Sequence, residues 1–122
     1  MPWLVHDGKV LATLEVATAR RDRVRGLIGR DHLEGALLLD PARSVHTFRM
    51  RMAIDVAFCD RELRVLRVVT MVPNRVGLPV WKARSAIEAE AGSFHRWGVT
   101  VGDRLEVRGG EASLDGRPGP GT

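Results

Sequence analysis

The feature that most constrains this chain is a series of short runs in which apolar residues recur at every second position. Residues 54–60 show the pattern most clearly, and residues 85–91 repeat it before Gly92. Successive side chains of a β-strand point to opposite faces of a sheet, so this period indicates strands. The same reasoning predicts a hairpin turning at Asp7-Gly8. Further strands are expected over residues 35–39, 44–52, 64–72 and 104–107.

One helix is expected, between Thr18 and Gly29. The Thr18 hydroxyl can cap the first turn, Gly29 can end the helix, and Val24, Leu27 and Ile28 form an apolar stripe between them. Residues 93–97 could add a single helical turn. Several short strands with one helix predict a mainly β fold, a small sandwich or partly closed barrel.

The size and composition predict one domain. The chain has 122 residues, of which 44% are hydrophobic, and we expect a single domain over residues 1–108 followed by a disordered Gly/Pro-rich tail over 109–122. No apolar run is long enough for a membrane span, and the N-terminus lacks an export signal, so we expect a cytoplasmic protein. The lone cysteine, Cys59, excludes an internal disulfide.

The charge is basic and unevenly distributed. The formal net charge is +4, and the predicted helix region concentrates arginines around a single acid, Asp22: Arg20, Arg21, Arg23, Arg25 and Arg30. Such a cluster attracts phosphate backbones or anionic membrane surfaces. Arginine is the main basic residue along the whole chain, so its presence here is not specific to the helix, and acidic residues elsewhere reduce the net positive charge. We therefore favour a solvated helix face and keep a nucleic-acid partner as an alternative.

Four stretches, in order, resemble a known family. They are residues 23–30 (RVRGLIGR), 46–58 (HTFRMRMAIDVAF), 87–92 (IEAEAG) and 97–103 (WGVTVGD). Together they resemble the uncharacterised conserved family called domain of unknown function 192, over about residues 10–108. The resemblance implies a small, mainly antiparallel, jelly-roll-like β fold with one short α-helix packed on it. It implies no reaction. Residues 48–52 depart from the Phe-Trp-Met-Lys-Asn of many relatives, so a ligand held there would be altered.

Seven residues form the candidate pocket. Asp55 lies between apolar residues and needs a partner, which Arg23 or Arg30 could supply as an internal brace. His46 shares a predicted strand face with two of the others and is interpreted first as a core histidine. Glu88 is interpreted as a solvated strand residue or a partner of an arginine, and a triplet of Glu88, Asp55 and Arg30 would make a polar pocket. The full set is Arg23, Arg30, His46, Phe48, Met50, Asp55 and Glu88.

Other chemistry has weaker support. Cys59 lacks a Cys–His signature and is interpreted as a small buried residue. No metal site and no cofactor are expected, since the four histidines are not spaced as ligand pairs: His6, His32, His46 and His95.

Three function classes follow from these residues. The favoured one is not an enzyme but a small soluble binding or interaction module for a peptide, a partner protein or a small anionic ligand. The second is a small hydrolase-like enzyme that uses His46 with Asp55. The third is a nucleic-acid-associated accessory protein that uses the arginine-rich helix.

Overall fold

A hairpin opens the chain in the structure, a computed structural model that describes residues 1–109. Strand β1 (Pro2–His6) turns into the long strand β2 (Lys9–Ala17). Asp7 and Gly8 both have positive φ, 50° and 77°. A two-residue turn with positive φ at both positions matches the twist of a hairpin, so the predicted Asp-Gly turn is confirmed.

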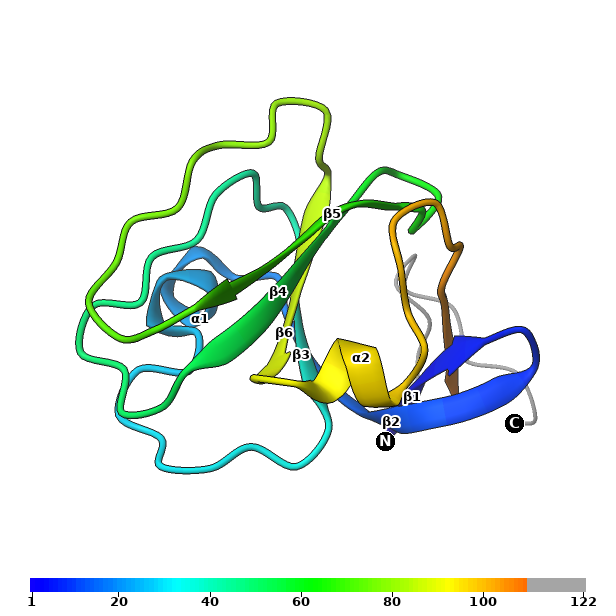
Figure 1. The fold of residues 1–122 in the computed structure, drawn as a ribbon, viewed down its shortest axis with the longest axis horizontal. Helices are drawn as coiled ribbons and strands as arrows, with labels where there is room; N and C mark the ends of the chain where they lie inside the picture. The colour runs from blue at the N-terminus through cyan, green and yellow to red at the C-terminus, as the bar shows by residue number, and fades with distance from the viewer. Residues whose placement is uncertain (110–122) are drawn as a thin grey trace.

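Seven strands form one sheet, which does not close (Figure 1). Its order is β5-β4-β6-β3-β2-β1-β7, where β3 is Ala36–Leu39, β4 is Ile54–Cys59, β5 is Val65–Met71, β6 is Ser85–Glu90 and β7 is Glu106–Gly109. The predicted mainly β class is confirmed. The sheet is mixed, however, because β2 and β3 run parallel while the other pairs are antiparallel.

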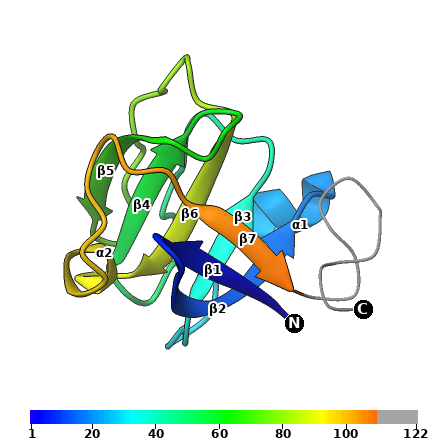
Figure 2. The same cartoon turned by 90° about the vertical axis from the view of Figure 1, so that its right-hand side faces the viewer.

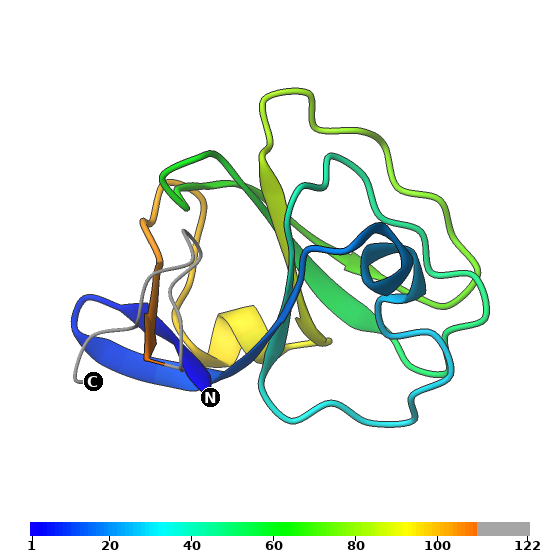
Figure 3. The ribbon, with the colours of Figure 1, turned by 180° about the vertical axis from the view of Figure 1, so that it is seen from behind.

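Parallel neighbours need a connection that returns to the same end of the sheet, and residues 18–35 supply it. This connection contains helix α1 (Arg20–Arg25), which Figure 3 shows beside the face of the sheet. The helix is shorter than the predicted Thr18–Gly29, and its first residue follows Ala19 without a side-chain cap. It ends early because Gly26 takes a φ of 46° and a ψ of −123°, which no helix continues.

Both faces of the central strands are buried. On one face, Val56 and Leu37 pack with Leu27 from the α1 connection. On the other face, Ala57 and Ile87 pack with side chains of the hairpin and of a second helix, α2 (Ser93–Arg96). Figure 2 shows α2 and the hairpin on this second side. The predicted alternation in residues 54–60 is therefore confirmed, but neither set of alternating residues is solvated.

Residues 44–52 are not the predicted strand. Within the described part of the chain they make one isolated β-bridge, between His46 and Val76, and Arg49 reverses the backbone with a φ of 62°. The segment belongs instead to a pair of irregular loops, residues 41–53 and 72–84, which we call the paired loops. The buried Thr47 hydroxyl joins them by donating to the Val72 carbonyl at 2.6 Å.

Two sequence predictions concern the ends and the membrane. The predicted tail, residues 109–122, lies outside the described residues except for Gly109, which ends β7. Within residues 1–109, no helix has the length and apolar character that crossing a membrane requires.

Candidate functional site

A cavity of about 290 Å³ lies beside α1, next to the first of the paired loops. Its wall combines apolar groups with arginines, a histidine and one carboxyl group. The lining residues are Arg23, Val24, Gly26, Leu39, Pro41, Ala42, Arg43, Ser44, Val45, His46, Met50 and Glu88. Polar and apolar groups contribute about equally to this wall, so the cavity suits a small polar ligand.

Glu88 is the buried acid of this cavity. It lies on β6 between Leu37 of β3 and Val56 of β4, and only 1% of it is exposed. Its Oε1 atom has no hydrogen-bond partner among the described residues. Loss of hydration raises the pKa of Glu88 to about 7. The prediction of a solvated Glu88 was wrong, because the loops and α1 cover the sheet face that an isolated strand would expose.

Gly26 brings α1 close to this carboxyl group. A Cβ atom at position 26 would lie 3.2 Å from Glu88 Oε1. The positive φ of Gly26 also disfavours any larger residue there. Two of the stretches that carry the family resemblance, residues 23–30 and 87–92, thus meet at one point in the cavity wall.

Basic side chains and Ser44 form the polar remainder of the wall. Arg23 is fixed, since its Nε donates to the Thr18 carbonyl and its Nη1 to the Pro41 carbonyl, both at 3.1 Å. Arg43 is exposed, and its side chain makes no ion pair within the described chain. His46 Nδ1 accepts the Phe48 N–H at 3.4 Å, which leaves Nε2 available. The site can therefore attract negative charge at its rim.

The structure brings four of the seven candidate pocket residues together: Arg23, His46, Met50 and Glu88 line the cavity. Phe48 is not a lining residue; it is half-exposed, with its ring 5.3 Å from that of His46. Arg30 does not line the cavity and binds Glu15 through two hydrogen bonds of 2.7 and 2.9 Å. That contact lowers the pKa of the Glu15 carboxyl and raises the pKa of Arg30.

Asp55 has a different role from the predicted one. Its carboxylate accepts hydrogen bonds from the Thr70 hydroxyl at 2.7 Å and from the backbone N–H groups of Gly92 and Phe94 at 2.9 and 3.3 Å. It therefore holds the start of α2, where free N–H groups favour an anion. Arg23 bonds to two backbone carbonyls and Arg30 to Glu15, so the predicted arginine brace of Asp55 was wrong. Asp55 and Glu88 lie on opposite faces of the sheet.

The same placement corrects two further interpretations. The proposed triplet of Glu88, Asp55 and Arg30 does not form. Glu88 lines the cavity, Asp55 bonds to Thr70, and Arg30 bonds to Glu15. His46 and Asp55 do not pair either: Asp55 does not line the cavity, and all three of its hydrogen bonds go elsewhere. The hydrolase interpretation thus lacks its carboxylate partner at His46.

Eight of the twelve lining residues were not among the candidates, and Gly26, Arg43 and Ser44 are three of these eight. Gly26 could have been found, because it lies in a motif of the resemblance. Nothing in the local sequence marks Arg43, which reaches the cavity because loop 41–53 lies beside α1, with the Pro41 carbonyl bonded to Arg23.

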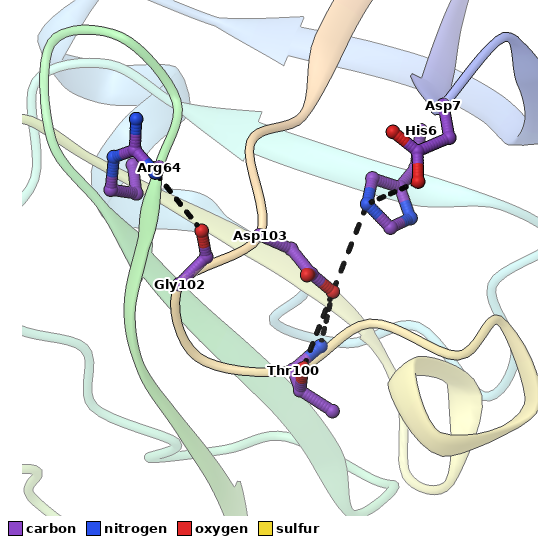
Figure 4. A network of polar contacts seen from close by, with 6 residues as sticks. All are labelled: His6, Asp7, Arg64, Thr100, Gly102 and Asp103. Carbon is purple, nitrogen blue, oxygen red and sulfur yellow. Dashed lines mark hydrogen bonds and ion pairs between the residues drawn. The ribbon is translucent and has the colours of Figure 1, made fainter.

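Two other groups from the sequence analysis are structural. Cys59 is fully buried in β4, and desolvation together with nearby Asp60 raises the pKa of its thiol to about 12. Asp103 accepts the Thr100 N–H at 2.8 Å and lies 3.8 Å from His6, which fastens the turn before β7 to the end of β1 (Figure 4). In residues 1–109, no group of three or more His, Cys, Asp or Glu side chains is placed to hold a metal ion.

Comparison with known proteins finds a matching family and relatives that are named as uncharacterised. The model of the DUF192 family, described as "Uncharacterized ACR", matches residues 3–107. UPF0127 proteins of Pyrococcus abyssi and Pyrococcus horikoshii are 38% and 36% identical over 63 residues, which is 52% of this chain. The matched region spans about half the length of these curated relatives, 54% and 55%.

Two crystal structures share the fold. One is a protein of unknown function from Novosphingobium aromaticivorans, with a TM-score of 0.74 at 20% identity over 86% of this chain and 82% of that chain. The other is a Sinorhizobium meliloti protein named a "putative transcription regulator", with a TM-score of 0.75 at 22% identity over 87% of this chain and 91% of that chain. At these identities the likeness shows the fold alone.

Proposed function

Because this chain belongs to the DUF192 family, a family of unknown function, its activity has to be argued from its own cavity, and we propose that it is a binding module for a small anionic ligand. The observation that carries the proposal is Glu88, a lining residue of the cavity whose buried Oε1 atom has no hydrogen-bond partner among the described residues. An unsatisfied buried group of this kind costs about 1–3 kcal/mol, which a bound ligand would recover.

The cavity wall indicates which groups the ligand carries. Arg43 and His46 at the rim favour a carboxylate or a phosphate. Glu88 accepts a hydrogen bond from a hydroxyl or amino group, or donates one when it is protonated. Leu39, Val45 and Met50 give the short body of the ligand an apolar wall. A small hydroxy- or amino-substituted acid meets all three requirements.

The alternatives have less support from the site. A hydrolase would need a group to orient His46, and Asp55 is committed to α2. A nucleic-acid accessory protein would use the arginines of α1, of which Arg23 is held by two backbone carbonyls. A peptide or protein partner, a single domain over residues 1–108 and a cytoplasmic location remain predictions from the sequence.

The test is native mass spectrometry of the gently purified protein, followed by thermal unfolding with a panel of hydroxy acids, amino acids and phosphate monoesters. We expect one class to raise the melting temperature of the wild type. Glu88→Gln, which keeps the shape of the side chain, should weaken that ligand by about tenfold or more, since a hydrogen bond to a charged group is worth roughly 1.5–3 kcal/mol.

Glu62→Gln is the matched control, because Glu62 is exposed and lies outside the cavity. Arg43→Ala should also weaken that ligand, because every class in the panel carries a carboxylate or a phosphate. A clean apo mass, with no panel member that stabilises the wild type, would overturn the proposal.

A further inference from the structure

The paired loops combine exposed apolar side chains with an unusual charge balance. Loops 41–53 and 72–84 contain six lysines and arginines and no aspartate or glutamate. They also carry several of the most exposed large apolar residues of the described chain, with Val76 70%, Leu78 73% and Trp81 75% exposed. Exposed apolar groups gathered beside cations mark an interaction surface.

Most of this positive charge is available to a partner. Arg51 is paired with Asp31 at 3.2 Å, and Arg84 with Asp40 at 2.8 Å. The other four cations make no ion pair within residues 1–109: Arg43, Arg49, Arg75 and Lys82. The surface therefore suits an anionic partner.

The loops hold a fixed shape, because their backbones bond to each other. The N–H of Thr47 donates to the Arg75 carbonyl at 2.8 Å, that of Gly77 to Val45 at 2.9 Å and that of Val80 to Arg43 at 2.7 Å. Loop 72–84 forms an outer contour of the molecule in Figures 1 and 3. The apolar tips are thus presented outward on a braced support.

We propose that the paired loops dock the protein on an anionic lipid bilayer surface, with Leu78 and Trp81 entering the interfacial region. Tryptophan favours the boundary between headgroups and acyl chains, and nearby cations strengthen binding to anionic lipid. A peptide adding as a strand is disfavoured, because the facing backbone groups of the loops already pair with each other. A nucleic acid could stack on Trp81 and contact the cations, but it is disfavoured because it would leave the exposed apolar side chains of Val76 and Leu78 without a partner.

The experiment is co-sedimentation of the whole protein with vesicles of phosphatidylglycerol and phosphatidylcholine, beside vesicles of phosphatidylcholine alone. We expect binding only to the anionic vesicles, and weaker binding as salt increases. Leu78→Ser with Trp81→Ser should lower the partition coefficient about tenfold or more. Arg75→Gln with Lys82→Gln should lower it about twenty-five-fold, since each cation near the surface contributes roughly a fivefold factor.

Matched controls separate position from composition. Lys9→Gln with Arg61→Gln removes the same charge from the β1–β2 hairpin and the β4–β5 turn, neither of which belongs to the paired loops. The hairpin lies at the opposite side of the molecule in Figure 1. Trp3→Ser removes another exposed tryptophan, on β1. Both control proteins should bind like the wild type, and circular dichroism should show that every variant is folded.

Three results would overturn the inference. They are no binding to anionic vesicles at low salt, equal binding to neutral vesicles, and equal losses in the loop variants and their controls. Retention of the protein by single-stranded DNA or by an acidic peptide, lost in the same loop variants while vesicles are not bound, would assign the surface to that partner instead. The four loop residues changed do not line the cavity, so this result is independent of the small-ligand proposal.

Discussion

At the scale of single residues, Glu88 shows how the fold controls one proton. Its carboxyl group has lost nearly all contact with water, and the covering residues give its Oε1 no hydrogen bond within the described chain. The neutral form is therefore favoured, and the pKa rises from 4.5 to about 7. Near neutral pH this residue can either donate or accept a hydrogen bond, which widens the range of ligand groups it can meet.

The raised pKa predicts a specific pH dependence of stability. Below pH 4.5 Glu88 is protonated in both the folded and the unfolded state, so its ionisation does not reduce the free energy of unfolding there. Between pH 4.5 and about 7 only the unfolded state releases the proton, so the free energy of unfolding falls as pH rises, by about 3 kcal/mol in all. Urea unfolding from pH 4 to 8 should show this slope in the wild type and in Glu62→Gln, and lose it in Glu88→Gln. An unchanged slope in Glu88→Gln would contradict the assignment.

At the scale of elements, the contact between α1 and β6 depends on Gly26. Gly26→Ala should destabilise the protein by about 2–3 kcal/mol, because alanine resists the positive φ and its Cβ would press on Glu88 Oε1 at 3.2 Å. Gly29→Ala is the control, since Gly29 also has a positive φ, of 81°, but no atom within 4 Å of an added Cβ. It should cost about 1–2 kcal/mol. Equal losses in urea unfolding would show that the close approach to Glu88 has no energetic weight.

The elements also show what a local pattern can predict. The central strands were predictable, because residues 54–60 and 85–91 keep a period of two over their whole length. Residues 44–52 have the same period but fold as a loop, since Arg49 reverses the chain and Thr47 bonds to Val72. A period of two therefore does not by itself distinguish a strand from an irregular loop.

At the scale of the whole molecule, contacts between segments distant in the chain determine the features that the local sequence pattern does not predict. The parallel β2–β3 pair and the coverage of both sheet faces depend on segments far apart in the chain. For this reason the burial of Glu88 and the separation of Asp55 from it were not predictable from their own strands. Four of the seven candidate pocket residues nevertheless came together, because they belong to the stretches 23–30, 46–58 and 87–92, which all contribute to the cavity wall.

The buried thiol offers a measure of cooperativity for the whole sheet. Cys59 lies in β4 with no exposed surface and with its pKa raised to about 12, so the native protein should not react with a thiol reagent. We expect the modification rate in increasing urea to follow the loss of circular dichroism, because exposing Cys59 requires the central strands to separate. Rapid modification in water, with circular dichroism unchanged, would reveal local opening of β4.

The place of β1 in the sheet has a consequence for synthesis of the protein. This strand leaves the ribosome about 100 residues before β7, the strand with which it pairs. At about 5–20 residues per second, the nascent chain keeps the outer edge of β1 unpaired for several seconds. During that interval the hairpin presents a free strand edge to neighbouring chains, and arrival of β7 closes it.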